Sequence, residues 1–378
     1  MYEVIIIGAG SVGTPIAMSL AARGVKPLVI DSGSSVGQGN NKCAIGGIRA
    51  THSDPAKVAL SLHSLKTFSN WEGVQGDDIG WFMGGYTFVA YTEEVSLSLQ
   101  NMIPAQQNAG LNIKWCDPDE IMKLVPGIAR EGLLGGTFSP EDGSASPMES
   151  CYAFQRHAVK EGAEFRFGET VESIEKKDHF TIRTDRGEYN AEKIINCTGS
   201  FSREVGAMIG VDLPVYPDMH EAGITEPVQR FFNPMVVDIS RSPGSANYYF
   251  YQYCTGQVVF CITPDPPLPG TGTAETSVFL PQVARRMVKL YPRLANIKVR
   301  RTWRGCYPQT PDGTPIIGQA GPAGSFVAVG MCGQGFMLGP GVGEVMARLV
   351  TDQSTEEDKM VLEAMKLDRE FTGVEALK

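Results

Sequence analysis

The segment Tyr2-Glu3-Val4-Ile5-Ile6-Ile7-Gly8-Ala9-Gly10-Ser11-Val12-Gly13 decides the fold of this chain. Its first residues form a short apolar run rich in β-branched side chains, which favours a strand buried on both faces. In the G-x-G-x-x-G pattern, Gly8 permits a sharp turn, Gly10 lets a pyrophosphate approach the backbone, and Gly13 lets the next helix pack on the strand. That helix directs its N–H groups and positive dipole end at the phosphates.

A second strand is predicted over Pro27-Leu28-Val29-Ile30-Asp31, and it ends in an acid eighteen residues after Gly13. At this place the Asp31 carboxylate accepts both hydroxyls of an adenosine ribose, and its charge repels a 2′-phosphate. A glycine-rich turn alone is weak evidence, because such turns also occur in unrelated α/β proteins. With the flanking strand, helix, second strand and terminal acid, the pattern predicts a dinucleotide site, but it does not separate FAD from NAD.

Composition narrows the class of protein. The chain has 378 residues, 42% hydrophobic and 20% charged, which is enough for two domains with sizeable cores. A net charge of −9 without a Lys/Arg cluster argues against nucleic-acid binding. We expect no membrane span, because no run of about 20 apolar residues occurs. The eight cysteines form no C-x-x-C pair, so we expect neither a zinc site nor an iron–sulfur cluster. We also expect no signal peptide before the first strand, and therefore reduced thiols and a cytoplasmic location.

Three later segments suit a flat cofactor. The glycine- and asparagine-rich loop from Ser32 to Arg49 is entropically costly unless a ligand orders it, and a mobile surface loop is the alternative. The strand from Lys193 opens into the small residues Thr198-Gly199-Ser200, where backbone again approaches a dinucleotide. The glycine-rich turn from Gly330 to Gly341 precedes a helix ending near Val350 and offers a second dipole end to a group such as a flavin carbonyl.

Periodicity and end signals place the remaining elements. Helices are expected over Pro55–Trp71, Glu93–Asn108, Asp117–Leu124, Ser146–Glu161 and Phe279–Leu290. Strands are expected over Trp81–Val89, Glu164–Phe167, Thr170–Lys176, Thr181–Thr184, Val299–Gly305 and Gly324–Val329, with several more between Val215 and Thr263.

Together these residues resemble the FAD-dependent oxidoreductase family of D-amino-acid oxidase, glycine oxidase and sarcosine oxidase. Four blocks carry the resemblance: Gly8 to Asp31, the loop to Arg49, Ile195-Asn196-Cys197-Thr198-Gly199, and Trp303 through Gly343. The loop Cys43-Ala44-Ile45-Gly46-Gly47-Ile48-Arg49 is most similar to β subunits of heteromeric sarcosine oxidases and dye-linked proline or hydroxyproline dehydrogenases. This resemblance implies noncovalent FAD, a secondary amino acid as substrate, and electrons passed to other subunits, with a second flavin, FMN, at a subunit interface as an open question.

The resemblance also implies the architecture. We expect an α/β fold with a Rossmann-like FAD-binding domain and a discontinuous antiparallel-sheet substrate domain. The FAD-binding domain is assigned residues 1–80, 145–214 and 300–378, and the substrate-binding domain residues 81–144 and 215–299.

Departures from the family pattern favour a dehydrogenase. Gly305 stands where monomeric sarcosine oxidase has the cysteine tethered to flavin, although Cys306 is adjacent. Met337 stands where relatives often have a lysine that helps to hold the substrate carboxylate. The segment Val258-Val259-Phe260-Cys261-Ile262 lacks the lysine that oxidases of this group place beside the flavin to promote reaction with oxygen.

The expected reaction moves a hydride from the carbon next to nitrogen onto the flavin, which needs no dedicated acid–base pair, and none is evident in the sequence. Arg49 is the predicted carboxylate clamp, because its planar fork holds a carboxylate through two hydrogen bonds; a structural ion pair is the alternative. His52 and Tyr251 are candidate pocket residues whose alternative is a core role. Tyr307 matches a family tyrosine that lines the substrate cavity.

The residues predicted to contact the cofactor follow from these blocks. They are Gly8, Gly10, Ser11, Val12, Gly13, Asp31, Ser32, Lys42, Cys43, Ala44, Gly47, Ile48, Val171, Thr198, Gly199, Gly305, Gly330, Gly333, Gln334, Gly335, Phe336 and Met337. Three alternative functions stay open at this stage: an oxidase that uses oxygen, a hydroxy-acid or glycerol-phosphate-type dehydrogenase on the same fold, and a flavin relay subunit without substrate chemistry.

Overall fold

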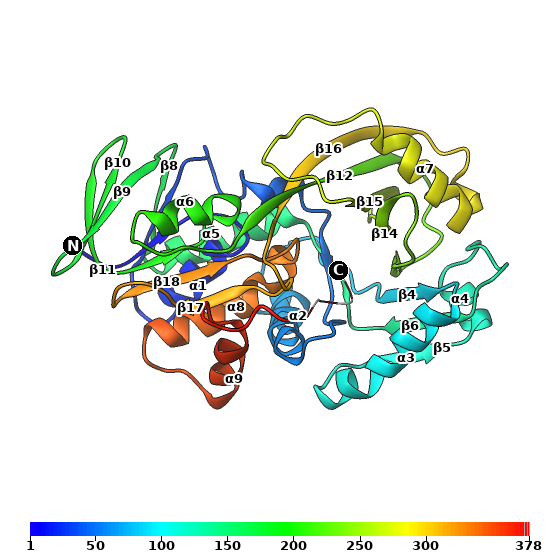
Figure 1. Cartoon of the computed structure of the whole chain (residues 1–378), viewed down its shortest axis with the longest axis horizontal. Helices are drawn as coiled ribbons and strands as arrows, with labels where there is room; N and C mark the ends of the chain where they lie inside the picture. Colours follow the sequence, from blue (N-terminus) through cyan, green and yellow to red (C-terminus); the bar gives the residue numbers. More distant parts are fainter. Residues whose placement is uncertain (374, 376, 378) are drawn as a thin grey trace.

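The apolar run at the start of the chain forms β1 (Tyr2–Ile7), which lies inside the first of two eight-stranded sheets (Figure 1). This computed structural model describes residues 1–373, 375 and 377. β1 pairs in parallel with β2 (Leu28–Asp31) and β11 (Glu188–Asn196). Parallel neighbours β8 (Glu164–Phe167) and β18 (Ser325–Val329) extend the sheet on the two sides, and β17 (Ile316–Gln319) pairs antiparallel to β18.

Helices cover one face of this first sheet. They are α1 (Gly13–Ala21), α2 (Pro55–Gln75), α5 (Pro147–Lys160) and α8 (Gly335–Val350), with α9 (Glu356–Met365) against α2 and β17. The hairpin β9 (Val171–Lys176) and β10 (Phe180–Thr184) and the short α6 (Ser202–Ala207) pack over the other face. β1 is therefore buried on both faces, as its run of apolar residues predicts.

The second sheet has the order β16-β12-β15-β14-β13-β4-β6-β5 and is mainly antiparallel. Its strands are β4 (Tyr86–Ala90), β5 (Lys114–Cys116), β6 (Gly135–Ser139), β12 (Tyr216–Pro227), β13 (Met235–Asp238), β14 (Gly244–Gln252), β15 (Gln257–Asp265) and β16 (Val299–Gln309). Residues of α4 (Pro118–Leu124) and α7 (Phe279–Leu290) join the core on one face. α3 (Glu93–Asn108) packs against β4, β5 and β6.

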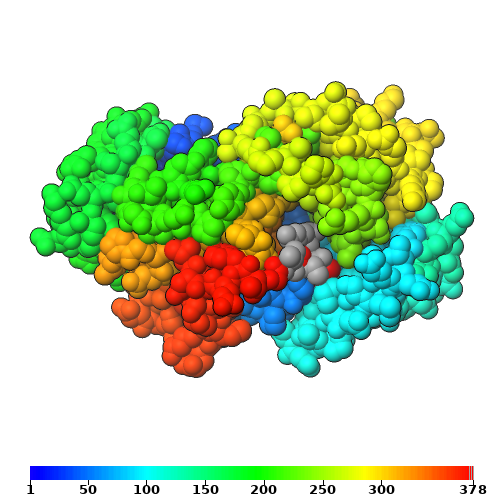
Figure 2. Space-filling model, in the orientation of Figure 1, coloured from blue at the N-terminus to red at the C-terminus, as the bar shows by residue number. Residues whose placement is uncertain are grey.

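Short elements complete the chain. They are η1 (Asn40–Cys43), η2 (Gly199–Phe201), η3 (Pro292–Leu294) and the two-stranded pair β3 (Gly47–Ile48) and β7 (Gly143–Ser144). Figure 2 shows the red C-terminal segment running from the first half of the molecule to the junction with the second. Within the described residues, no helix has the length and apolar character needed to cross a bilayer.

Two sequence expectations were wrong. The strand expected from Trp81 begins only at Tyr86, because Gly85 before it has a φ of 80° and turns the backbone. The strand expected to end at Gly305 continues to Gln309, and it pairs with β12 from Val299 onward. It therefore belongs to the second sheet, although residues 300–309 were assigned to the cofactor-binding part; the other predicted domain boundaries stay predictions.

Candidate active site

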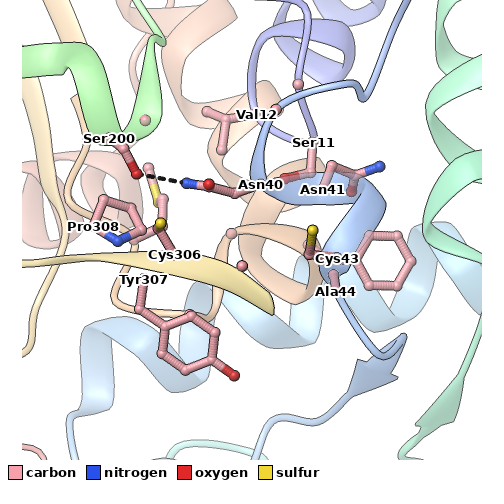
Figure 3. Close-up of a pocket in the computed structure, with 18 of the residues that line it drawn as sticks. Ser11, Val12, Asn40, Asn41, Cys43, Ala44, Ser200, Cys306, Tyr307 and Pro308 are labelled. Carbon is pink, nitrogen blue, oxygen red and sulfur yellow. Dashed lines mark hydrogen bonds between the residues drawn. The ribbon is translucent and has the colours of Figure 1, made fainter. Parts of the chain in front are cut away.

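A cavity of about 690 Å³ lies between the two sheets. Its walls come from the turn after β1, the loop after β2, η1, the start of α8 and the inner face of the second sheet. Figure 3 shows residues of these segments converging, with Asn40 donating a hydrogen bond of 2.8 Å to Ser200 across the cavity wall. The volume falls in the range of pockets that enclose a small-molecule ligand or cofactor.

Two helix N-termini meet at this cavity, because α1 and α8 pack unusually closely. A Cβ on Gly339 of α8 would lie 2.0 Å from the Ser11 carbonyl oxygen, and one on Gly343 would lie 2.9 Å from Pro15. Only glycine fits at these places, so the first turns of both helices come together. Ser11 and Gly335 line the cavity beside them, which gives a place for an electron-rich group near two positive dipole ends.

The glycines of the first turn have different roles. A Cβ on Gly13 would lie 1.9 Å from the Gly8 carbonyl oxygen, so Gly13 serves packing. A Cβ on Gly10 would meet nothing within 4 Å, and Gly10 lines the cavity. The open space over Gly10 is therefore a cradle of the kind that a pyrophosphate fills.

Asp31 lies at the cavity wall, and its carboxylate orders the turns around it. Oδ2 accepts the Ala9 N–H at 2.6 Å and Oδ1 accepts the Gly33 N–H at 2.6 Å. Each carboxylate oxygen has a further lone pair, so the predicted bonds to ribose hydroxyls remain chemically available.

Two buried oxygens at the wall have no hydrogen-bond donor among the described residues. They are Oδ1 of Asn41 and Oε1 of Gln334, and both residues line the cavity. Buried polar atoms are nearly always satisfied in native proteins, so these oxygens indicate a ligand that supplies N–H or O–H groups. Together with the Gly10 cradle they fit a dinucleotide cofactor.

The inner face of the second sheet closes the other side of the cavity. Strand register aligns Val237, Tyr249, Cys261, Ala222 and Trp303 across neighbouring strands, and all five line the cavity. The Tyr249 and Tyr307 hydroxyls lie 2.6 Å apart on this wall. Burial raises the pKa of both tyrosines, so both hydroxyls keep their protons.

Asp218 and His220 form a buried pair that our reading of the sequence missed. His220 Nε2 lies 2.9 Å from Asp218 Oδ2, and the His220 ring stacks on the Tyr307 ring with centroids 3.7 Å apart. Asp-x-His spacing within a strand places both side chains on one face, which is the signal that could have identified the pair.

Arg49 lines the cavity, but much of its guanidinium is occupied. One terminal nitrogen donates to the Thr51 carbonyl and contacts His52 Nδ1 at 3.3 Å, and the other donates to the Leu377 carbonyl. These contacts use three of the five donors of the side chain, so two remain for a ligand. The clamp role of Arg49 remains a prediction that its position allows.

Most predicted site residues line the cavity. They are Gly8, Gly10, Ser11, Val12, Asp31, Ser32, Cys43, Ala44, Gly47, Arg49, Val171, Thr198, Gly199, Gly305, Tyr307, Gly333, Gln334, Gly335, Phe336 and Met337. Gly333 also has a packing role, because a Cβ there would lie 2.4 Å from the Tyr307 ring.

Six predicted residues do not line the cavity: Gly13, Lys42, Ile48, His52, Tyr251 and Gly330. Gly13 packs α1 on the turn after β1, as described above. Lys42 is exposed, and Ile48 lies in the core beside the helices. Gly330 is enclosed, because a Cβ there would lie 2.4 Å from Thr310.

Two of the predicted catalytic residues, His52 and Tyr251, lie behind the cavity wall rather than on it. His52 is fully buried and packs against Arg49, and Tyr251 donates its hydroxyl to the Ile45 carbonyl. Tyr249 and Tyr251 share a face of β14, but the register brings Tyr249, and not Tyr251, to the cavity. Neither His52 nor Tyr251 therefore lies where a substrate in this cavity would touch it.

No lysine is among the cavity-lining residues of the part of the chain that the structure describes. Cys261 takes the wall position on β15, and Met337 lines the cavity at the start of α8. Arg49 is therefore the wall residue with a permanent positive charge.

The parallel sheet, the glycine turn under α1 and the cavity beneath an antiparallel sheet are typical of dinucleotide-dependent oxidoreductases that act on small molecules. A family model described as "FAD dependent oxidoreductase" matches residues 3–349. The chain belongs to this family of FAD-dependent oxidoreductases, whose members among its relatives act on amino acids.

Three proteins illustrate the similarity to relatives that act on amino acids. Glycine oxidase of Bacillus licheniformis is 28% identical, and the alignment covers 97% of each chain. The mouse mitochondrial sarcosine dehydrogenase is 25% identical over 94% of this chain and 40% of its own. The crystal structure of L-proline dehydrogenase from P. horikoshii superposes with a TM-score of 0.90 at 28% identity and covers 97% of this chain and 96% of that one.

When bound, FAD supplies the hydride acceptor for oxidation of an amino-acid C–H bond. The residues of this chain have separate tasks around it. Gly10 and the N-terminus of α1 would hold its phosphates, Asp31 would hold its ribose, and the N-terminus of α8 would face an electron-rich group such as a flavin carbonyl. Tyr249, Tyr307, His220 and Arg49 are polar residues of the cavity wall that could orient a substrate.

Proposed function

We propose that this protein is a dehydrogenase for a small secondary amino acid of the sarcosine, proline or hydroxyproline class, and that its electrons pass to a partner subunit or another acceptor. The observation that carries the proposal is the composition of the cavity wall. Arg49 offers a cation for the substrate carboxylate, and the described wall contains no lysine to promote the reaction of reduced flavin with oxygen. The relatives named sarcosine dehydrogenase and L-proline dehydrogenase support the substrate class.

A substrate titration without oxygen tests the proposal. The purified holoprotein is mixed with sarcosine, L-proline, hydroxyproline or D-amino acids under nitrogen, and the absorbance of oxidised flavin is followed. We expect a secondary amino acid to bleach the flavin, with slow peroxide formation once air is admitted. No bleaching by any amine would reject the proposal, and rapid peroxide formation would identify an oxidase instead. Bleaching by a hydroxy acid but not by its amine analogue would select the hydroxy-acid alternative.

Arg49→Ala separates a substrate role from a structural one. We expect it to slow substrate reduction of the flavin by orders of magnitude while the flavin stays bound. Arg286 supplies the matched control, because it is 7% exposed against 6% for Arg49, it also binds backbone carbonyls, and it lies away from the cavity. If Arg286→Ala, which disturbs the fold similarly, impairs reduction as much as Arg49→Ala does, the clamp assignment fails.

We also propose that the FAD is held without a covalent bond. The Cys306 thiol donates to the Gly270 carbonyl at 3.5 Å, and burial raises its pKa, so it stays a neutral thiol rather than a nucleophilic thiolate. Precipitation with acid should release all the flavin into the supernatant. If the protein is purified together with a partner subunit, chromatography of the same acid extract shows whether FMN is bound in addition to FAD.

A further inference from the structure

His220 stands between a buried carboxylate and the cavity. Its Nε2 bonds to Oδ2 of Asp218, whose Oδ1 accepts the Leu268 N–H at 2.6 Å. The two side chains are 3% and 10% exposed. His220 lines the cavity and Asp218 does not, so a bound ligand meets the imidazole rather than the carboxylate.

The hydrogen bond to Asp218 decides which ring nitrogen is left as an acceptor. A carboxylate only accepts, so the shared hydrogen lies on Nε2 of His220. Burial lowers the pKa of His220, and the charge of Asp218 only partly opposes this, so the ring is neutral at neutral pH. Nδ1 then presents a bare lone pair. It is buried, and none of the described residues donates to it.

The surrounding wall fixes the ring in place. His220 lies opposite Gly305 on β16, and the pairs Asp218–Tyr307 and Ala222–Trp303 flank this position on the same face. The His220 and Tyr307 rings stack with their centroids 3.7 Å apart and an interplanar angle of 21°, so Tyr307 covers one face of the imidazole. An oriented acceptor with no partner is costly unless a ligand supplies the donor.

We propose that Nδ1 of His220 accepts the amine N–H of the substrate, and that Asp218 is a positioning residue that holds His220 in the accepting tautomer. This inference rests on the proposed function, because it requires an amino-acid substrate. The neutral form of a secondary amino acid has one N–H. When His220 accepts it, the nitrogen lone pair stays free to assist loss of the hydride from the adjacent carbon.

Asp218→Asn gives the sharpest test, because it should invert the hydrogen bond. The carbonyl oxygen of the introduced amide can keep the bond from Leu268 N–H, and the amide nitrogen then donates to Nε2. The hydrogen of the ring moves to Nδ1, which becomes a donor. His220→Asn keeps an amide near the Nδ1 position and retains an acceptor, whereas His220→Phe keeps a flat ring on Tyr307 and removes the acceptor.

The test measures the affinity of each holoprotein for pyrrole-2-carboxylate and 2-furoate by calorimetry. These planar analogues of a cyclic imino acid are not turned over, and they differ in whether the ring atom donates or accepts. We expect wild type to prefer the pyrrole by about 10- to 100-fold, His220→Asn to keep part of this preference and His220→Phe to lose it. Asp218→Asn should reverse the preference.

An unchanged affinity ratio in the Asp218 and His220 variants would overturn the inference, and a change in thermal stability alone would show that Nδ1 has a structural role. Equal affinities of wild type for the two analogues, or no affinity for either, would also overturn it. Bleaching of wild-type flavin by L-proline or sarcosine is measured in parallel. Flavin bleaching therefore tests the proposed function, and the affinity ratios separately test the role of His220.

Discussion

The hydroxyls of Tyr249 and Tyr307 lie 2.6 Å apart on the cavity wall, although 58 positions of sequence separate them. One hydroxyl donates to the other, so only one O–H of the pair is left to bind a substrate.

We therefore expect Tyr249→Phe and Tyr307→Phe each to weaken substrate binding by about 1 kcal/mol. The double variant should lose less than the sum, with a coupling of about 0.5–1.5 kcal/mol, because either substitution already breaks the pair. Flavin spectra recorded with increasing substrate give the dissociation constants. Tyr91→Phe is the control, since its hydroxyl bonds to the Ala129 carbonyl away from the cavity. Strict additivity would show that the two hydroxyls act independently.

Gly10 and Gly13 belong to one motif, but their substitution should have opposite consequences. Gly10→Ala adds a methyl group to open space, so the stability of the flavin-free protein should change by less than about 0.5 kcal/mol while FAD is no longer retained. Gly13→Ala forces a methyl group onto the Gly8 carbonyl and should destabilise the protein itself by about 1–3 kcal/mol or more. Thermal melts of stripped protein and the flavin content after gel filtration separate the two effects. If Gly10→Ala lost stability as Gly13→Ala does, the space over Gly10 would not be an open site for the cofactor.

Asp142 should impose a pH dependence on stability. It is fully buried, where it accepts the Ala50 N–H at 3.0 Å and the Thr51 hydroxyl at 3.1 Å, and burial raises its pKa to about 7. The unfolded chain ionises this group near 3.8, so stability falls as the pH rises from about 4 to about 7 and then levels off. The shift of roughly 3 units corresponds to about 4 kcal/mol.

Asp142→Asn keeps the shape of the side chain without the titration. The difference between the unfolding free energies of variant and wild type should therefore change across this pH window in favour of the variant. Urea unfolding at several pH values between 4 and 8 measures it. Parallel curves for the two proteins would show that Asp142 does not titrate with a raised pKa.

Local patterns predicted much of this structure. The β-branched run of β1, the glycines that follow it and Asp31 lie within about thirty residues of one another. Over such a short segment, the residue types alone predict the turn and the buried strand. The register between strands cannot be predicted from a local pattern in this way. Alternation places Tyr249 and Tyr251 on one face of β14, and only pairing with β13 and β15 decides that Tyr249 reaches the cavity.

Pairing likewise assigns β16 to the second sheet and brings the Asp218–His220 face opposite Tyr307. The resemblance to a family identified the cofactor, but it did not show the contacts of the C-terminal residues. Lys57 and Glu375, 318 positions apart, meet only because α2 and the end of the chain converge in the folded molecule.

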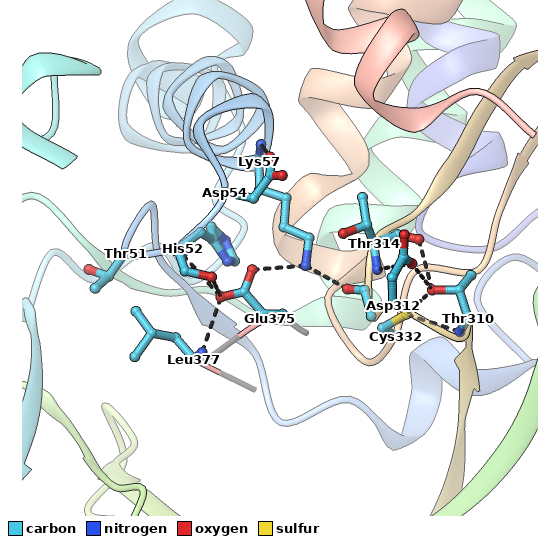
Figure 4. Close-up of polar contacts among 12 residues, drawn as sticks. Thr51, His52, Asp54, Lys57, Thr310, Asp312, Thr314, Cys332, Glu375 and Leu377 are labelled. Atoms are coloured by element: carbon cyan, nitrogen blue, oxygen red, sulfur yellow. Dashed lines mark hydrogen bonds and ion pairs between the residues drawn. The ribbon is translucent and has the colours of Figure 1, made fainter. Parts of the chain in front are cut away.

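The Lys57–Glu375 ion pair yields the last prediction. Its nitrogen and oxygen lie 3.0 Å apart, with side chains 0% and 1% exposed, and Lys57 also donates to the Gly313 carbonyl (Figure 4). Glu375→Gln leaves a buried ammonium without its counter-charge, which should lower the free energy of unfolding by about 3–5 kcal/mol. The double variant Lys57→Met/Glu375→Leu should recover most of this loss, because it removes both charges together. Glu363→Gln, in an exposed pair with Lys366, is the control and should leave the transition unchanged.

The pH dependence of the same pair checks its charge state. Burial acts to raise the pKa of Glu375, but the charge of Lys57, together with contributions from His52, Ser53 and Arg49, outweighs it and holds that pKa below its ordinary value of 4.5. The contribution of the pair is therefore complete above pH 4.5 and is lost as the pH falls toward the lowered pKa, so wild type and Glu375→Gln should converge in stability only in acid. Chemical denaturation of both proteins between about pH 3 and pH 7 measures the gap between them. A gap that is as wide in acid as at neutral pH would show that Glu375 stabilises the fold through the shape of its side chain rather than through its charge.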